Sequence, residues 1–397
     1  MRAALALPTR PHLVQRRGVA CFSSARSLRR DTSASSITTT TLVTDTGAPQ
    51  RVLSGIQPTG SPHLGNYLGS ISNWVRLQQS VNPSTAAVDR CRLVFSIADL
   101  HAVTIPQDPV ALRQDIRHMA AVILASGLQP DRCVLFRQSQ IYEHAMLSWL
   151  FQCLTPMGWL NRMTQWKSKL QQKRGEAAQV ENFDIGKSGL CLGLFAYPTL
   201  QAADILLYKG EIVPVGEDQI QHIELARDTA LLANKTVKQD VFPLPRALLT
   251  PTKRIMSLRD PTRKMSKSDP SVMARISVDD DPDTIRLKIR KATTDSISVP
   301  SFDPVGRPGV SSLLEIYSAL DGRTIDQLCT AYQTANTQQF KQDLADVVVE
   351  KLAPIRHELV RIEKDPAYLD AVLDDGAVQA REIASANYRE FARLMGL

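Results

Sequence analysis

Short apolar runs alternate with longer helical periods along the body of the chain, and this alternation constrains the fold more than any other feature. The run RLVFSIADLHAV, residues 92–103, predicts a strand followed by a loop. The next segment, 107–128, has helical spacing, opens at Asp108-Pro109 and closes at Gly127. Two further strands are predicted within 133–140 and 211–219. This order favours an α/β fold with a Rossmann-like, doubly wound parallel sheet, whose ligands bind beyond the carboxyl ends of the strands.

The last third of the chain has a different character, because strand-like runs vanish after about residue 280. From Leu344 onward, apolar residues follow at steps of three and four, which predicts a long amphipathic helix: Val348, Leu352, Ile355, Leu359 and Ile362. Further helices are expected within 311–335 and 376–395. We therefore predict a catalytic part over 48–280, with an exposed polar insertion at about 167–189, and an all-helical domain over 281–397.

The first 47 residues have the composition of an organelle transit peptide. They are rich in Arg, Ser and Thr, and their seven arginines and two aspartates carry +5 of the formal net charge of +7. A basic tail that binds RNA is the alternative, but the lack of lysine and the N-terminal position favour targeting. We expect this segment to be removed and the mature protein to lie in the mitochondrial matrix. No later run is apolar enough to span a bilayer, so we expect a soluble protein without membrane contact.

The six cysteines are scattered along the chain. None forms a CxxC pair or pairs with histidine at the spacing of zinc ligands. The sequence therefore predicts neither a disulfide framework nor a bound metal, and a reducing compartment fits this pattern.

A short strand-like piece runs into Gly55 at the start of the glycine-rich stretch LSGIQPTGSPHLGNYLGS, residues 53–70, and this stretch predicts an anion site. Its glycines let a ligand approach the backbone, and a helix beginning near Asn66 directs free N–H groups at an anion. His63 could add a hydrogen-bond donor to a phosphate. The alternative is a glycine-rich turn with a surface histidine.

Asp204 stands in an apolar, helical run, YPTLQAADILLY. Gln201 and Tyr197 precede it by one and two turns, so all three side chains share one face. A carboxylate in such surroundings usually has a specific donor. A ligand donor, an internal helix cap and a buried ion pair remain open at this point.

The third motif is KMSKS, residues 264–268, within RIMSLRDPTRKMSKSDP. It holds two lysines around a methionine and small hydroxyls, and its charges suit a negative group held over a loop.

Together these stretches resemble the class I aminoacyl-tRNA synthetases, specifically the tryptophanyl enzymes of the bacterial and mitochondrial type. SGIQPTGSPHLGNYLGS is similar to that family's first signature, and KMSKSDP to its second. QAADILLY, PVGEDQIQHIEL and RIMSLRDPTRKMSKSDP match in order and spacing, and the resemblance covers roughly residues 51–397. It implies a ligase that activates L-tryptophan with ATP and Mg²⁺ to tryptophanyl-adenylate and pyrophosphate, then transfers tryptophan to tRNA(Trp) in mitochondrial translation. It also implies that the helical domain binds the anticodon.

The resemblance implies roles for particular residues, residue by residue. The implied catalytic residues are His63, Gly65, Asn66, Lys264 and Lys267. The implied ATP-binding residues are Gln57, Pro58, Thr59, Gly65, Asn66, Gly216, Glu217, Asp218, Ile255, Lys264, Met265, Ser266, Lys267, Ser268, Lys167 and Lys169, with no protein ligand to a metal. The implied tryptophan-binding residues are Asp204, Tyr197, Gln201, Gln219 and His101. Solvated lysines are the alternative for Lys167 and Lys169.

Within this reading, Asp204 would accept the indole N–H, which is a donor only. Two departures from the family pattern concern the pocket: Gln201 replaces a common Met, and Leu53 replaces a usual aromatic residue. The resemblance further implies a homodimer, with the apolar segment 145–163 as the partner surface or, alternatively, as core. Competing hypotheses are a tyrosyl enzyme, a small-molecule adenylyltransferase and a non-catalytic RNA-binding relative.

Overall fold

The structure is a computed structural model that describes residues 50–80, 92–164, 166–167, 191–249, 254–267 and 269–397. The expected transit peptide and nearly all of the expected insertion at 167–189 lie outside these residues, as do Lys169 and Ser268.

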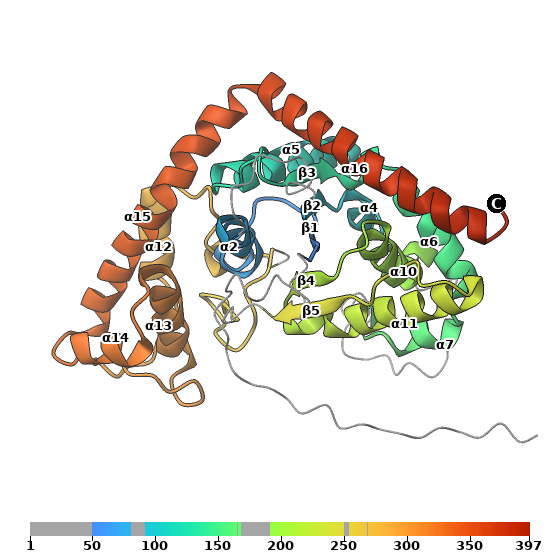
Figure 1. The fold of residues 1–397 in the computed structure, drawn as a ribbon. Helices are drawn as coiled ribbons and strands as arrows, with labels where there is room; N and C mark the ends of the chain where they lie inside the picture. The colour runs from blue at the N-terminus through green and yellow to red at the C-terminus, as the bar shows by residue number, and fades with distance from the viewer. Residues whose placement is uncertain (1–49, 81–91, 165, 168–190, 250–253, 268) are drawn as a thin grey trace, which may run out of the picture. The chain divides into compact units, whose positions relative to one another are not determined.

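A five-stranded parallel sheet forms the centre of the described chain (Figure 1). Its strands are β1 Val52–Ile56, β2 Leu93–Ile97, β3 Val134–Arg137, β4 Ile212–Val215 and β5 Arg246–Leu249. They lie in the order β3-β2-β1-β4-β5, and every neighbouring pair is parallel. The direction of winding reverses between β1 and β4, where such folds bind their ligands. The predicted doubly wound sheet is therefore confirmed, and β5 is a strand that the sequence did not indicate.

Helices connect successive strands. After β1 the chain forms one continuous helical segment from α1 Leu64–Asn66 through a π-helical turn, η2 Tyr67–Ile71, to α2 Ser72–Ser80. The short α4 Asp99–Ala102 and the long α5 Pro109–Ala125 follow β2, while η3 Gln138–Gln140, α6 Glu143–Leu154 and α7 Met157–Arg162 follow β3. The connection α10 Leu192–Leu207 leads into β4, and η4 Glu217–Gln219 with α11 Ile220–Val237 leads towards β5.

The helix α5 begins and ends where its sequence predicts. The Asp108 carboxylate accepts from the amides of Val110 and Ala111 at 3.0 and 2.8 Å, which caps the first turn beside Pro109. Gly127 follows the last turn at φ +104°, a conformation that suits glycine.

After residue 270 the described chain forms helices and no further strand, apart from an isolated bridge between Ser277 and His63: η5 Val272–Ala274, α12 Pro282–Arg290, α13 Pro308–Asp321, α14 Ile325–Ala331, α15 Thr337–Glu363 and α16 Pro366–Leu394. The amphipathic helix predicted from Leu344 is α15, and its apolar stripe is buried from Leu344 to Ile362. The predicted all-helical C-terminal region is therefore confirmed, while its role as a separate domain with a boundary at 280 stays a prediction.

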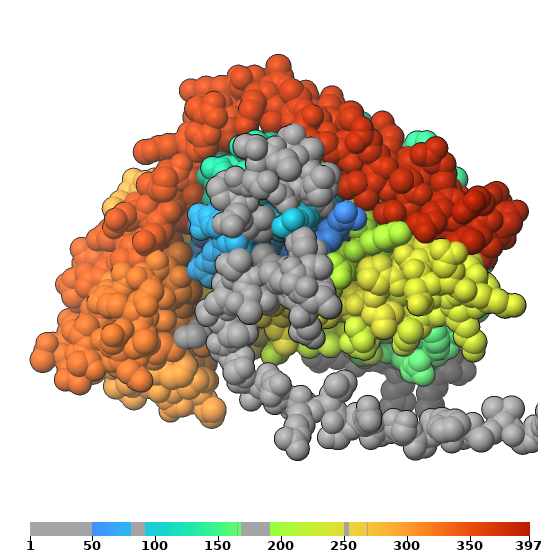
Figure 2. Space-filling view, in the orientation of Figure 1, coloured from blue at the N-terminus to red at the C-terminus, as the bar shows by residue number. Residues whose placement is uncertain are grey.

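The helical region packs directly on the α/β part. The helix α15 lies against α5, and α16 lies against β3. A Cβ atom added at Gly376 of α16 would lie 1.8 Å from the Leu135 carbonyl oxygen, so only glycine permits this approach. The outer faces of α15 and α16 form part of the surface in Figure 2. Within the described residues, none of the helices has the length and apolar character needed to cross a membrane.

Candidate active site

Loops at the carboxyl ends of four strands bring the predicted site residues to one edge of the sheet. Residues 57–61 follow β1 and residues 216–219 follow β4, on the two sides of the point where the winding reverses. His101 follows β2 on α4, and Gln138 follows β3 on η3. The sheet thus joins a glycine-rich loop to a buried polar group from other parts of the chain.

His63 caps the helix that follows β1. Its Nδ1 accepts from the Asn66 amide at 3.2 Å, and the Asn66 side-chain oxygen accepts from the His63 amide at 3.2 Å. The helix therefore begins at Leu64, two residues before the predicted start. His63 is buried, which excludes the surface-histidine alternative. Burial, with the charges of nearby cationic side chains, lowers the pKa of His63 to about 4. The ring is neutral and carries its proton on Nε2, as a donor to an anion requires.

Gly65 allows the His63 ring to lie close to the segment that carries the lysines. A Cβ atom at Gly65 would lie 2.9 Å from His63 Cε1 and 3.6 Å from Ile255 Cβ. Any larger residue would push the ring away, so this glycine serves a close approach. Ile255 is buried, and its carbonyl accepts from the Met265 amide at 2.9 Å.

The two lysines of the KMSKS motif occupy different environments. Met265 between them is buried, and Lys264 is exposed at an antiparallel bridge to Met256. Lys267 is half-buried and donates from Nζ to the Gly60 carbonyl at 3.0 Å. Burial lowers the pKa of Lys267 to about 8, although the carboxylates of Asp115 and Asp279 act in the opposite direction.

Three of the predicted ATP-binding residues lie at the short helix η4. Gly216 caps it, and Glu217 and Asp218 are exposed. Gln219 donates to the Asp218 carboxylate at 2.9 Å, and Gln201 of α10 donates to the Gln219 side-chain oxygen at 3.3 Å. This pair of glutamines connects η4 to the helix that carries Asp204.

Asp204 is the centre of a buried group of polar side chains. His101 Nε2 lies 2.7 Å from Oδ2, while Gln138 Nε2 and His144 Nδ1 each lie 2.7 Å from Oδ1. Burial alone would raise the pKa of Asp204, but His101 and His144 hold it well below its usual range. An ionised carboxylate only accepts, so both histidines donate to it, and the other ring nitrogen of His144, Nε2, lies 2.9 Å from the Tyr208 hydroxyl.

These partners of Asp204 are side chains of other elements, as in the ion-pair alternative, rather than the backbone of its own helix. His101 was predicted to lie at this site, whereas Gln138 and His144 were not. Both follow the observed strand β3, which ends at Arg137 within the predicted segment 133–140, and the rule that ligands meet at strand ends could have indicated them.

Tyr197 completes the same face of α10. Its hydroxyl lies 2.8 Å from His222 Nε2, and its ring meets His101 edge-on at 6.2 Å between centroids. Burial lowers the pKa of His222 to about 4, so this imidazole is also neutral. Asp204 and Tyr197 therefore both contact His101, as expected for side chains on one helix face.

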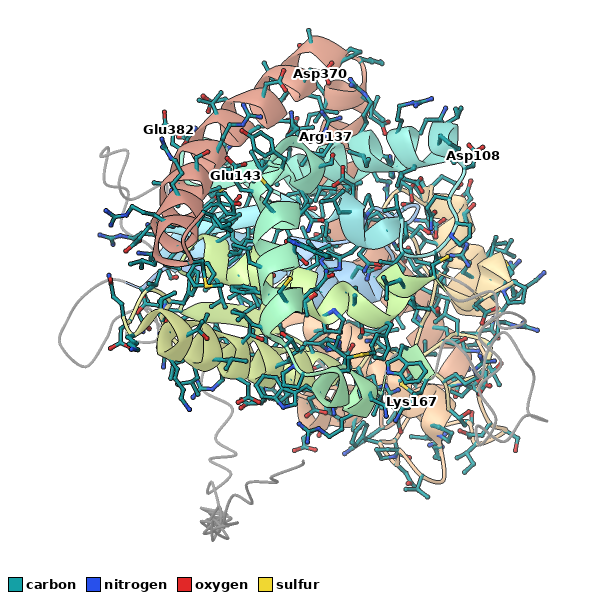
Figure 3. The ribbon with its side chains drawn as sticks, turned by 90° about the vertical axis from the view of Figure 1, so that its right-hand side faces the viewer. Asp108, Arg137, Glu143, Lys167, Asp370 and Glu382 are labelled. Atoms are coloured by element: carbon teal, nitrogen blue, oxygen red, sulfur yellow. The ribbon has the colours of Figure 1, made fainter. Side chains whose placement is uncertain are left out.

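The remaining predicted residues are less closely grouped. Gln57 is exposed, Pro58 is buried, and Thr59 turns back to donate from its amide to the Gln57 carbonyl at 3.0 Å. Ser266 is partly buried. Lys167 lies over the Trp166 ring, 5.5 Å from its centroid. Figure 3 shows Lys167 on the far side of the molecule from Asp370 and Glu382 of α16.

The sequence and the fold of this chain are similar to those of known proteins. The family described as tRNA synthetases class I (W and Y) matches residues 45–353. A tryptophan–tRNA ligase from Rickettsia conorii is 45% identical over 346 residues, which cover 87% of this chain and 98% of the relative. The crystal structure of tryptophanyl-tRNA synthetase from Mycoplasma pneumoniae superposes with a TM-score of 0.76 at 36% identity, covering 88% of this chain and 98% of that one. The enzyme from Campylobacter jejuni, complexed with ADP and tryptophan, gives a TM-score of 0.70 at 31% identity, covering 88% and 100%.

Proposed function

This chain belongs to the class I tRNA synthetases, among the tryptophan–tRNA ligases, and we propose that it charges tRNA(Trp) with L-tryptophan inside mitochondria. The observation that supports the choice of amino acid is the buried Asp204 group, whose partners His101 and Gln138 follow the carboxyl ends of β2 and β3.

The first step joins tryptophan to AMP. The tryptophan carboxylate attacks the α-phosphorus of ATP, a bond forms between them, and pyrophosphate leaves. Such chemistry depends on positioning and on charge placed where negative charge grows. The His63 Nε2–H and the start of the helix at Leu64 offer donors to phosphate oxygens, and Lys264 and Lys267 offer positive charge to pyrophosphate.

Mg²⁺ enters this scheme as part of the substrate MgATP. Among the described residues, no group of three or more His, Cys, Asp or Glu side chains could hold a metal ion. The ion would therefore travel with the phosphates and neutralise part of the charge on the leaving pyrophosphate.

Asp204 and the residues around it would select the amino acid. Oδ1 already accepts two hydrogen bonds, whereas Oδ2 accepts one. Oδ2 could therefore accept a second hydrogen bond, from the indole N–H. Tyr197, Gln201 and Gln219 would hold the amino and carboxylate groups. A buried acceptor of this kind disfavours an amino acid that lacks the matching donor, because Oδ2 would then lose water without gaining a second hydrogen bond.

Tryptophan-dependent pyrophosphate exchange tests the activity. We expect exchange with tryptophan and ATP, and none with tyrosine or without an amino acid, followed by charging of tRNA(Trp). Exchange that depends on tyrosine would favour the tyrosyl alternative. Exchange with another acceptor and no amino acid would favour an adenylyltransferase.

Three finer features complete the proposal. The family match begins at residue 45, and the Arg-rich, acid-poor segment before it supports mitochondrial import. The helical region would bind the tRNA anticodon. Exposed apolar side chains on α6 and α7, namely Met146, Trp149 and Met157, support a homodimer.

Import and assembly have their own tests. A chain that starts at residue 48 should keep its activity in vitro but no longer reach mitochondria, and undiminished delivery would contradict the targeting hypothesis. Sedimentation should give a dimer that Trp149→Glu weakens, whereas a monomeric wild type would contradict the assembly.

A further inference from the structure

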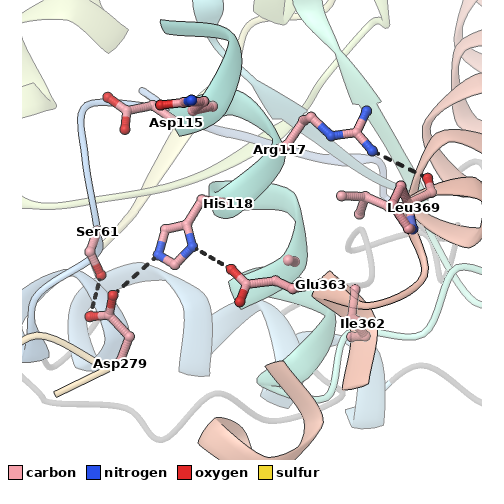
Figure 4. Close-up of a pocket in the computed structure, with 11 residues that line it drawn as sticks. Ser61, Asp115, Arg117, His118, Asp279, Ile362, Glu363 and Leu369 are labelled. Atoms are coloured by element: carbon pink, nitrogen blue, oxygen red, sulfur yellow. Dashed lines mark hydrogen bonds and ion pairs between the residues drawn. The ribbon is translucent and has the colours of Figure 1, made fainter. Parts of the chain in front are cut away.

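A crevice of about 540 Å³ lies beside the loop that follows β1. Its walls come from that loop, from α5, from the segment before α12 and from the junction between α15 and α16. Figure 4 shows its main polar side chains: Ser61, Asp115, His118, Asp279 and Glu363. The crevice thus places three carboxylates next to the glycine-rich loop, and the roles assigned above use none of them.

One of these carboxylates holds the peptide that Lys267 contacts. The Gly60 amide donates to Asp115 Oδ2 at 2.8 Å, and the Gly60 carbonyl accepts from Lys267 Nζ at 3.0 Å. Gly60 has φ +72°, a conformation that few other residues adopt. Asp115 of α5 and the lysine loop are therefore joined through the Gly60 residue.

The charges around Lys267 come from several elements. Asp115 and Asp279 favour its protonated form, with Asp115 the stronger of the two, while Arg275 disfavours it. His63 also lies within electrostatic reach, because the charges of Lys267, Lys264 and Arg275 help to lower the pKa of its imidazole. Burial already lowers the pKa of Lys267 to about 8. The loss of one favourable carboxylate would lower this pKa further, so that Lys267 would lose its proton closer to neutral pH.

We propose that Asp115 is a positioning residue for the activation step: it fixes Gly60 by its amide and keeps Lys267 charged at the Gly60 carbonyl until the phosphates of ATP draw the lysine away. This proposal rests on the proposed function, because it concerns the lysine that would act on pyrophosphate. Asp115 itself touches no reacting atom.

The other two carboxylates of the crevice provide a graded comparison. Asp279 accepts from the Ser61 hydroxyl at 2.6 Å and lies 3.5 Å from His118 Nε2. Glu363 lies 2.8 Å from Nδ1, the other ring nitrogen of His118, and is not among the charges that act on Lys267. Asp279 should therefore have a weaker effect than Asp115, and Glu363 should have none.

The test measures kcat/KM for ATP in the absence of tRNA, at saturating tryptophan, between pH 6 and 9.5. This parameter reports groups that titrate in the free enzyme. We expect the wild type to lose activity with a midpoint near pH 8. Asp115→Asn, which can still accept from the Gly60 amide, should move that midpoint down by about one pH unit. Asp279→Asn should move it less, and Glu363→Gln should leave it in place with an unchanged Tm.

A second variant separates charge from geometry. Asp115→Ala removes the acceptor as well as the charge, so it should show the same displaced midpoint and also a lower kcat/KM at pH 6.5, where Lys267 is protonated in every variant. Tryptophan affinity should stay the same. Coincident pH profiles for the wild type, Asp115→Asn and Asp115→Ala would overturn the proposal.

A measurement that does not depend on catalysis tests the role of Asp115 independently of the proposed function. The rate at which acetic anhydride labels Lys267, followed by peptide mass spectrometry across the same pH range in the full chain, reports the free amine directly. Asp115→Asn should shift the labelling curve to lower pH, and Glu363→Gln should not. A curve unchanged in Asp115→Asn contradicts the proposal even if the protein proves to activate another substrate.

Discussion

The two ends of the candidate site are built differently. At the amino-acid end, Asp204 and Tyr197 are buried and already have partners on other elements. At the nucleotide end, Glu217, Asp218 and Lys264 are exposed, and Lys267 contacts a backbone carbonyl that a substrate could replace. Under the proposed function, this difference means that selection of the amino acid is preorganised, whereas the charges for catalysis would move onto the phosphates when ATP binds.

The buried end has an energetic consequence. Removing the Asp204 side chain would leave His101, His144 and Gln138 without their shared acceptor, and breaking a buried charged group of this kind costs about 3–5 kcal/mol. At the nucleotide end, substitution of an exposed charge should cost little free energy of unfolding, because exposed charges contribute little to stability. Substitutions at the two ends should therefore differ in stability as well as in catalysis.

The largest effect is expected from Lys267→Ala. Loss of one group that stabilises transition-state charge costs about 2.7–4 kcal/mol, or roughly 100- to 1000-fold in the activation rate. The Tm should change little. Arg263→Ala is the matched control, since it removes an exposed positive charge from the same segment. Its rate should stay near that of the wild type, and an equal loss in both variants would contradict a specific role for Lys267.

Acid should destabilise both ends. His63 at the nucleotide end and His222 at the amino-acid end have a pKa of about 4 in the folded state. Their ordinary value is about 6.5, so the unfolded chain binds more protons below that pH. Stability should thus decline as the pH falls from about 6.5 to 4, by roughly 3 kcal/mol for each histidine.

Urea unfolding between pH 4 and 7 measures this loss. His63→Asn and His222→Asn should each flatten the pH dependence by about half. A wild-type free energy of unfolding that stays constant over this range would contradict the assignment of two buried neutral imidazoles.

A somewhat smaller effect is expected from Asp204→Asn. A charge-assisted hydrogen bond contributes about 1.5–3 kcal/mol, so kcat/KM for tryptophan should fall roughly tenfold to a hundredfold. Preference for tryptophan over an analogue with sulfur in place of the indole N–H should shrink, because the amide leaves a milder vacancy than a carboxylate.

The matched control for Asp204→Asn is Tyr208→Phe, which removes the hydroxyl bonded to His144 and leaves Asp204 intact. It should lower the Tm and keep the preference ratio. If Asp204→Asn also loses only stability and keeps that ratio, Asp204 is a structural residue and not a specificity element.

The sequence predicted local features of the chain better than contacts between distant segments. Apolar runs and turn residues indicated four strands of the sheet and placed α5 between Asp108 and Gly127, because these features are local. The strand β5 escaped because its residues are not buried in alternation, and its pattern is too short to stand out. His63 was expected before a helix start, but only its geometry shows that it is the cap itself.

Contacts between distant segments could not be predicted in the same way. The Asp204 carboxylate contacts His144, Gln138 and His101, which stand 60, 66 and 103 positions before it in the chain. Only the order of the strands in the sheet brings these side chains together. The contact between Lys267 and Gly60 spans 207 positions, so nothing in KMSKS alone shows that its two lysines differ in burial. The motifs therefore indicated candidate residues, while the pairing between them depends on the fold.

Calorimetric titration of tryptophan without nucleotide tests the division between the two ends most directly. If selection is preorganised at Asp204, tryptophan should bind the wild type and Lys267→Ala with Kd values within about twofold, whereas Asp204→Asn should bind it at least about tenfold more weakly. Equal weakening in both variants, or weakening in Lys267→Ala alone, would contradict the account.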